Sequence, residues 1–346
     1  MNPYMAYDAV NTKIATQKGR LLDRRNLEKM MACNTVEQIT ELLFTQYGFQ
    51  EYVDHSRIHD LHRDDLETLL NSYKVAIIEN ILHYFSGPYK DFLQTLLMEY
   101  EIYDIVLILR KIARSEDVEE IMAHFVHSES YSDLPYDKLA FSKTVPQFIE
   151  NLKNTRYYFA LKTLTGSDAL KREFHIEMKL QLLYYKTLLK RAEKLSAADK
   201  KTALELIGLR IDFLNVQWIY RARSHYNISP EQMLIYSLQG GRKLGFDKLR
   251  KLCYAKGADE VKQLSKQYLG TDIFTSDQGS EIDKNIDQAM LKFVKGRKYE
   301  GTIGTVLSYV YILGSAIREF IAITEGIRYK MPGEQLRKYL IRLGNR

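Results

Sequence analysis

Three pairs of polar side chains recur along this chain at a spacing that could support acid–base chemistry. They are Asp8 with Asn11, Glu101 with Asp104, and Asp212 with Asn215. Within each pair the residues are three positions apart, so on a helix they lie one turn apart on the same side. A carboxyl group held beside a second carboxyl or an amide could take a proton from a substrate and return it.

A second candidate site is a run of three histidines. His55, His59 and His62 stand at positions i, i+4 and i+7, with aspartates nearby. On a helix this spacing would place three imidazoles on one face, where they could bind zinc or nickel. Such a polar stretch is more often a solvated connection between helices. We therefore predict no metal site and keep a helical metalloprotein as an alternative.

The common enzyme motifs are missing from the sequence. It contains no nucleotide-binding loop, dinucleotide fingerprint, nucleophile elbow or HExxH sequence. One Gly-rich turn, from Leu238 to Lys243, could hold an anion through its backbone N–H groups and two cations. A turn between helices, with glycine supplying a positive φ, is the simpler interpretation and the one we favour. We predict no catalytic residue, no cofactor and no enzymatic activity.

The recurrence of the three polar pairs also argues against catalysis, because a catalytic pair is rarely needed in triplicate. Buried polar groups that bond one another or an arginine would instead set the register of neighbouring helices. Arg110 and Arg221 are the expected charge partners of the second and third pairs. We predict that the three pairs, both arginines and Trp218 are structural residues.

The polar pairs lie on helices with a regular apolar face. Around the third pair, Ile211, Leu214 and Trp218 form a stripe at i, i+3 and i+7. The corresponding positions around the other two pairs are also apolar or aromatic. The opening helix of each copy is therefore predicted to pack its stripe into a core and to carry its polar pair beside it.

A second marker has a similar period. A tyrosine near the end of a short helix recurs at Tyr47, Tyr157 and Tyr268, at intervals of 110 and 111 residues. Two markers with a period of about 100 residues indicate three copies of one unit. The predicted repeats are 1–97, 98–206 and 207–346, and the third includes C-terminal closing helices.

Helix is the only secondary structure that the sequence favours. Six prolines and 18 glycines leave room for long helices, and alternating runs with hairpin turns are missing. The fold class is predicted to be all-α. In the last long helix, 309–325, Ser315, Ile317, Arg318 and Ile321 take the repeat positions and the acid is lost, so this helix is predicted to be a degenerate copy that closes the structure.

Charge and hydropathy narrow the possible partners. The net charge is +6, but acids are interleaved with the basic residues nearly everywhere, which does not favour nucleic acid. The 25 tyrosines favour helix packing over base stacking, since no strand framework would present them. The best candidate for a membrane span, 304–317, is uncharged but shorter than the roughly 20 residues of a bilayer crossing. We predict no direct membrane span.

Three all-helical units that open with an acid-x-x-Asn/Asp helix resemble the C subunit of the V/A-type ATPases, whose eukaryotic counterpart is the V-ATPase d subunit. The local matches are IDFLNVQWIYRARSHYNIS at 211–229, Leu-x-x-Thr-x-Tyr at 152–157 and FHIEMKLQLLYY at 174–185. The C-terminal YVYILGSAIREFIAITEGIRYKMPGEQLRKYL also fits, apart from the acid usual in that helix. The resemblance covers essentially the whole chain.

This resemblance implies a non-catalytic rotor subunit. Family members form a funnel of three helical domains related by a pseudo-threefold axis, between a membrane proteolipid ring and the central shaft subunits. The implied location is peripheral, on the cytoplasmic side of the membrane, in an ion-transporting rotary ATPase. A generic helical-repeat scaffold for other protein partners is the first alternative.

Overall fold

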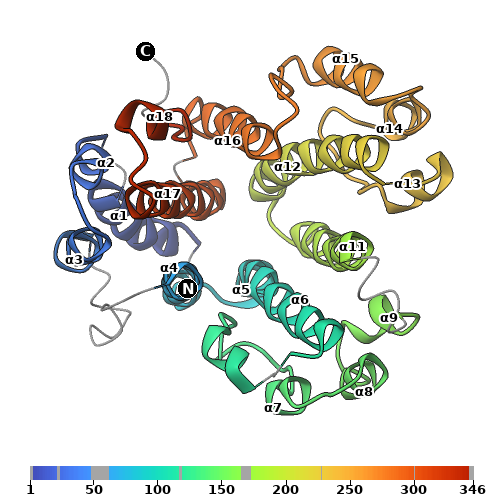
Figure 1. Cartoon of the computed structure of the whole chain (residues 1–346), viewed down its shortest axis with the longest axis horizontal. Helices are drawn as coiled ribbons and strands as arrows, with labels where there is room; N and C mark the ends of the chain where they lie inside the picture. Colours follow the sequence, from blue (N-terminus) through green and yellow to red (C-terminus); the bar gives the residue numbers. More distant parts are fainter. Residues whose placement is uncertain are drawn as a thin grey trace. The chain divides into compact units, whose positions relative to one another are not determined.

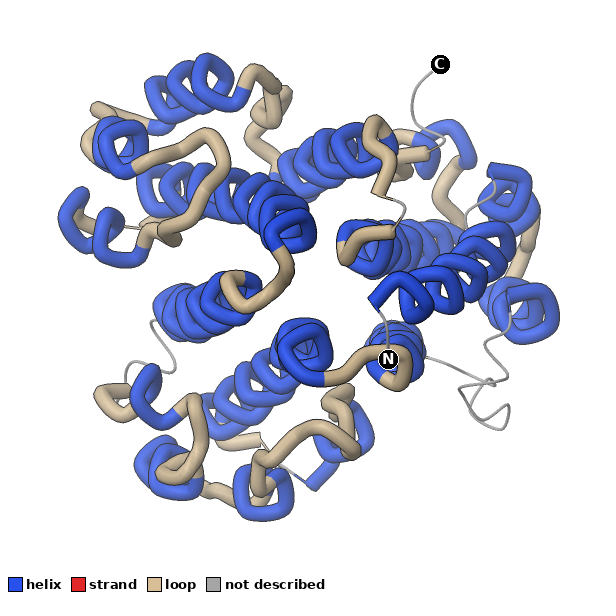
Figure 2. The backbone as a smooth tube through the Cα atoms, turned by 180° about the vertical axis from the view of Figure 1, so that it is seen from behind, coloured by secondary structure: helices blue, strands red, loops and turns tan. Residues whose placement is uncertain are grey.

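The computed structural model of the chain describes residues 3–21, 24–47, 62–116, 119–164, 173–226, 228–299 and 301–342. Every regular element in these ranges is a helix, as the tube in Figure 2 shows. The prediction of an all-α fold is confirmed. His55 and His59 lie outside the described residues, whereas His62 is exposed just before a helix. The described ranges hold no group of three His, Cys, Asp or Glu side chains that could bind a metal ion.

The chain divides into two compact units, of which one is continuous and spans Asp64–Arg191. This unit, hereafter the continuous unit, contains three long helices, α4, α6 and α11, with short helices between them. Its elements are α4 (Arg63–Leu82), α5 (Gly87–Gln94), η3 (Thr95–Leu97), α6 (Met98–Arg114), η4 (Glu119–His124), α7 (Tyr136–Ala140), α8 (Val145–Asn151), α9 (Tyr158–Leu161) and α11 (Glu173–Ala192).

The second unit combines Met1–Arg63 with Ala192–Arg346 and is therefore discontinuous in sequence. Its described helices are α1 (Pro3–Leu21), α2 (Arg24–Met31), α3 (Val36–Tyr47), α12 (Ala197–Ser224), α13 (Pro230–Tyr236), α14 (Phe246–Cys253), α15 (Ala258–Leu269), α16 (Gly279–Lys295), α17 (Gly304–Arg328) and α18 (Gly333–Arg337). Helix α1 from the start of the chain packs against α17 in this unit (Figure 1).

Two long helices organise the discontinuous unit. Helix α12 contacts α14, α15, α16 and α17, while α17 contacts α1, α2, α3 and α18. The pairs α2–α3 and α14–α15 match in length, with helices of 8 and 12 residues in each pair. Both pairs pack against a long buried helix, which agrees with a repeated plan. The division into three sequence repeats stays a prediction.

The helix boundaries follow local sequence signals. Ser196 and Ser229 accept hydrogen bonds from the backbone N–H groups three residues later and so cap α12 and α13. Gly270 ends α15 with a φ of 66°, in the left-handed region where glycine is favoured. The ends of these helices are therefore set by residues at their own termini.

One described helix, α17, is long and apolar enough to cross a bilayer by length and composition. In its most apolar 18-residue window 72% of the residues are buried inside the protein. Tyr309, Leu313 and Phe320 lie in the core of the unit, and α1, α2 and α3 pack around the helix. These contacts are those of a core helix in a folded domain, as the sequence predicted for residues 304–317.

Candidate functional site

In the continuous unit, Asp104 links α6 to the segment that follows η4. Its carboxylate is buried and accepts hydrogen bonds from the backbone N–H groups of Val126 and His127, at 3.0 and 3.1 Å. The His127 Nδ1 atom lies 2.7 Å from the same carboxylate, and the imidazole stacks on the ring of Tyr136. A single aspartate thus holds an irregular segment against a long helix.

In the discontinuous unit, Asn215 on α12 likewise holds the backbone of a segment that follows its helix. Its Oδ1 atom accepts from the backbone N–H of Leu238 at 2.7 Å, and its Nδ2 donates to the carbonyl of the same residue at 2.8 Å. All of these atoms are buried. The amide side chain therefore satisfies both backbone groups of Leu238, which would otherwise be left in the core without a partner.

Asp212 lies one turn before Asn215 and binds the Gly-rich turn. Its two carboxylate oxygens accept from the backbone N–H groups of Lys243 and Leu244, at 2.7 and 3.0 Å. Gly240 has a φ of 92°, which favours glycine at that position. The turn does hold an anion through its backbone, as its composition allowed, and that anion is the protein's own Asp212.

Glu319 on α17 is a fourth residue of this kind, and the repeat pattern in the sequence did not reveal it. Its Oε1 atom accepts from the backbone N–H groups of Ile341 and Arg342, at 2.8 and 2.9 Å, and its carboxylate is buried. At the repeat position itself the acid is replaced by Ser315, as predicted from the sequence, but an acid outside the repeat pattern stands one position after Arg318. We call Asp104, Asp212, Asn215 and Glu319 the backbone anchors.

A spacing rule connects three of the backbone anchors. Asp104 binds a backbone N–H group 22 residues later, Asn215 one 23 residues later, and Glu319 one 22 residues later. A search for a polar residue in a buried stripe, followed by an apolar residue 22 or 23 positions on, would have found Glu319. The three long helices α6, α12 and α17 each bind the segment that follows them in this way.

Glu101 occupies the sequence position equivalent to Asp212 but has a different partner. Its carboxylate is buried on α6 and accepts a hydrogen bond from the hydroxyl of Tyr157 at 2.5 Å. Tyr157, one of the recurring tyrosines, is itself fully buried between α8 and α9 in the sequence. This contact joins the two sequence markers of the repeat in one hydrogen bond.

The remaining predicted residues have other surroundings. Asp8 is exposed on α1, and the Oδ1 atom of Asn11 is buried without a hydrogen-bond partner among the described residues.

Arg221 lies 4.0 Å from Asp283 and is partly exposed, so it does not serve as the charge partner of Asp212. Arg110 is half-buried, whereas Trp218 is buried as predicted. Backbone N–H groups of Lys243 and Leu244 take the place at Asp212 that was expected for Arg221.

Burial raises the pKa of both Asp104 and Asp212, and the hydrogen bonds that each carboxylate accepts offset part of this effect. A raised pKa keeps more protons on the folded state than on the unfolded state. The contribution of such a group to stability is therefore present at low pH and is lost as the pH rises through the folded-state pKa. The chemistry here is hydrogen bonding to backbone, with no bound substrate required.

The variant Asp212→Asn tests this electrostatic picture. Both carboxylate oxygens accept a backbone N–H, so an amide would place its own N–H₂ against a donor, and we expect a loss of about 2 kcal/mol in unfolding free energy. Because the pKa of Asp212 is raised above 3.8, the advantage of wild type over the variant should shrink as the pH rises from about that value. Urea unfolding of both proteins across this range measures the difference. A difference that grows with pH would contradict the raised pKa of Asp212, whereas the absence of any loss in the variant would contradict the hydrogen bonds.

The comparisons with known proteins agree with this architecture. A profile of the ATP synthase (C/AC39) subunit family matches residues 10–339. The C subunit of the A-type ATP synthase of Archaeoglobus fulgidus is 22% identical over 342 residues, which cover 97% of this chain and 96% of the relative. The C subunit of the A-type ATP synthase of Methanosarcina mazei is 22% identical over 252 residues, or 73% of this chain and 68% of the relative. The match to the family profile spans nearly all of the helices described above, and the chain belongs to the ATP synthase (C/AC39) subunit family.

Proposed function

We propose that this chain is a non-catalytic rotor subunit that couples the membrane proteolipid ring of a V/A-type ATPase to the central shaft subunits. The observation that carries the proposal is the set of backbone anchors on three long helices. A part that transmits torque must resist twisting, and buried polar contacts that tie each long helix to its following segment oppose sliding of one against the other. Family membership supplies the complex in which such a part works.

The proposed arrangement follows the family resemblance. Three helical repeats related by a pseudo-threefold axis would form a funnel on the cytoplasmic side of the membrane, with the ring at one end and the shaft at the other. The net charge of +6 supports a location near anionic lipid headgroups. The repeated plan of two helix pairs on α12 and α17 supports the pseudosymmetry.

A non-catalytic role is supported by the way the polar residues are used. The carboxylates that could have served as acid and base, Glu101, Asp104 and Asp212, are occupied by hydrogen bonds from the protein itself. Carboxyl groups that accept such hydrogen bonds hold other parts of the protein in place and are not free to act on a substrate. The ATP-hydrolysing residues of the complex would then lie on other subunits.

Reconstitution of the complex tests the coupling role. Membranes carrying the native ATPase would be stripped of this subunit and then supplied with the purified chain. We expect the detached heads to hydrolyse ATP without it, while ATP-driven ion transport is lost on stripping and restored by addition. Transport that persists without the chain would refute the proposal, and hydrolysis by the heads that depends on the chain would refute the non-catalytic role.

Co-purification separates a rotor subunit from a generic helical scaffold. A tagged chain isolated from its native membrane should bring a proteolipid and the shaft subunits with it in constant proportion. A scaffold for other partners would instead bring proteins unrelated to the ATPase. The outcome depends on the identity of the partners, so mass spectrometry of the isolated complex decides it.

A further inference from the structure

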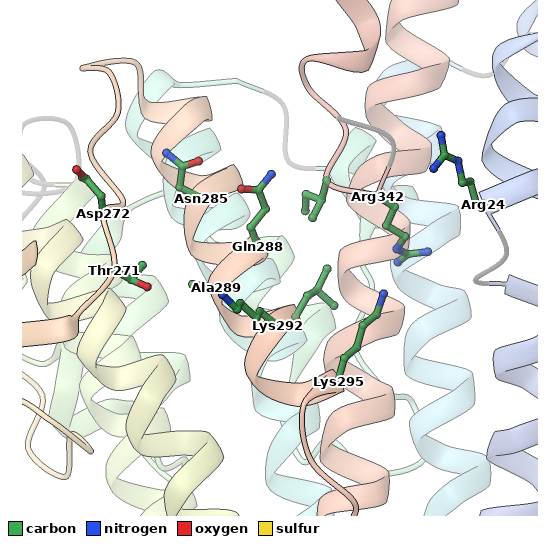
Figure 3. A pocket seen from close by; sticks show the side chains of 11 residues that line it. Arg24, Thr271, Asp272, Asn285, Gln288, Ala289, Lys292, Lys295 and Arg342 are labelled. Carbon is green, nitrogen blue, oxygen red and sulfur yellow. The ribbon is translucent and has the colours of Figure 1, made fainter. Parts of the chain in front are cut away.

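A pocket of about 570 Å³ lies in the discontinuous unit, beside α16. It is lined by Arg24 from α2, by α16, by the loop at Thr271–Asp272 and by the segment that follows α18. Figure 3 shows these side chains along one side of α16 and across from it. The family resemblance and the backbone anchors assign no ligand to this pocket.

The lining is rich in cations and amides. Four of its side chains are basic, namely Arg24, Lys292, Lys295 and Arg342, and Asn285 and Gln288 contribute amide groups. The carboxylate in the lining, Asp272, already lies 2.9 Å from Lys266, outside this set. Among the described residues, no carboxylate pairs with Lys292 or Lys295. These two lysines therefore give the pocket excess positive charge that the described part of the protein does not neutralise.

Arg342 supplies a second and independent observation. Its side chain is 7% exposed, so more than nine-tenths of it is buried at the wall of the pocket. The Nε atom lies 3.1 Å from Glu319, and Nη2 donates to the carbonyl of Ile312 at 3.4 Å. The Nη1 atom is buried and has no hydrogen-bond acceptor among the described residues. A buried guanidinium N–H without an acceptor costs free energy unless a ligand supplies one.

The direction of the side chains agrees with a shared ligand. In Figure 3 the amine of Lys295 points toward the guanidinium of Arg342, and Arg24 lies across from both on α2. Like charges that converge repel one another, and an anion between them turns this repulsion into attraction. Burial also lowers the pKa of Arg342, and a bound anion would oppose that effect.

We propose that this pocket binds an anion carrying two or more phosphate groups. Guanidinium and ammonium groups around one space suit phosphate oxygens, since arginine offers paired N–H donors and lysine a mobile point charge. Lys292 and Lys295, which no described carboxylate pairs, favour two phosphate groups over one. Arg24 and Arg342 can add hydrogen bonds to the ligand, although they also bond Glu28 and Glu319. None of the described residues that line the pocket is aromatic, so they offer no stacking surface for a nucleotide base, and the recognised part is the phosphate chain.

Isothermal titration with inorganic tripolyphosphate tests the pocket directly, using the full chain. The variant K292Q/K295Q removes two exposed charges from the lining, and K251Q/K256Q removes two exposed charges from α14 and the turn after it. We expect the first variant to bind tripolyphosphate about tenfold more weakly and the second to bind as wild type does. Circular dichroism with thermal unfolding confirms that both variants are folded.

Two further arms identify the source of the phosphate. Flotation with vesicles that contain a bisphosphorylated inositol lipid measures whether a lipid headgroup is preferred. Binding to these vesicles but not to tripolyphosphate, lost in K292Q/K295Q, would assign the pocket to a membrane phosphate. Titration with a polyglutamate peptide measures whether carboxylates bind at this pocket in place of phosphates. The proposal is overturned if both variants lose tripolyphosphate binding equally, if neither phosphate source binds, or if the peptide binds at this pocket and the phosphates do not. None of these outcomes depends on the coupling role.

Discussion

Asn215→Leu is expected to lower the free energy of unfolding by about 3 kcal/mol, because it leaves both backbone groups of Leu238 without a partner. Each buried polar group left unpaired costs about 1–3 kcal/mol. Leucine and asparagine side chains have the same number of heavy atoms, so packing changes contribute less than the lost hydrogen bonds. Guanidinium unfolding of the purified chain measures the loss.

The control for this substitution is Gln263→Leu. Gln263 is an exposed amide on α15, and its replacement should change the unfolding free energy by no more than about 0.5 kcal/mol. In the reconstituted ATPase, Asn215→Leu should reduce ATP-driven transport while hydrolysis by the detached head stays unchanged. A variant as stable as wild type would show that Asn215 is not needed to hold the segment at Leu238. Hydrolysis lost in the head alone would contradict a structural role.

Gly241→Ala is the second substitution with a large expected effect. A Cβ atom at this position would lie 2.3 Å from Oδ1 of Asp212 and 3.0 Å from the carbonyl oxygen of Leu244. Both distances are shorter than van der Waals contact, so the turn must move away and weaken the hydrogen bonds that Asp212 accepts. We expect a loss of about 2 kcal/mol or more in unfolding free energy.

Gly245→Ala provides the matched control four residues along the same segment. A Cβ atom there would meet no atom within 4 Å, and the φ of Gly245 is −75°. Gly245 is the N-cap of α14, where glycine is preferred over alanine, but alanine also reduces the entropy of the unfolded chain. The two effects oppose one another, so we expect a change of no more than about 1 kcal/mol, smaller than that of Gly241→Ala. Equal destabilisation by the two substitutions would show that close approach to Asp212 is not the cause. Thermal unfolding of both variants at one pH is sufficient.

Local sequence patterns predicted the helices well because each helix carries its own signals. The apolar stripe at Ile211, Leu214 and Trp218 marks a helix face that is indeed buried. The stripe did not predict where that helix starts. In the structure, α12 begins at Ala197, well before Ile211. Residues 197–210 carry a more mixed pattern, and it is their packing against other helices that stabilises them.

The partners of the polar residues could not be predicted from local pattern. Asp8 and Asp212 occupy the same repeat position, yet the first is exposed and the second binds a turn. The difference lies in which segment passes over the helix, and the spacing of side chains on the helix does not report it. Glu319 was missed for the same reason, because its longer side chain reaches the backbone from a position shifted by one.

The discontinuous unit has a consequence for the order in which the protein forms during synthesis. The continuous unit, Asp64–Arg191, is built from one stretch of chain, so we expect it to form its core before the later helices have been made. Helices α1, α2 and α3 pack on α17, so their apolar faces stay uncovered until residues 304–328 have been made. Helices α1, α2 and α3 are thus made well before the helix that buries them, and during this interval we expect their apolar faces to be open to a chaperone.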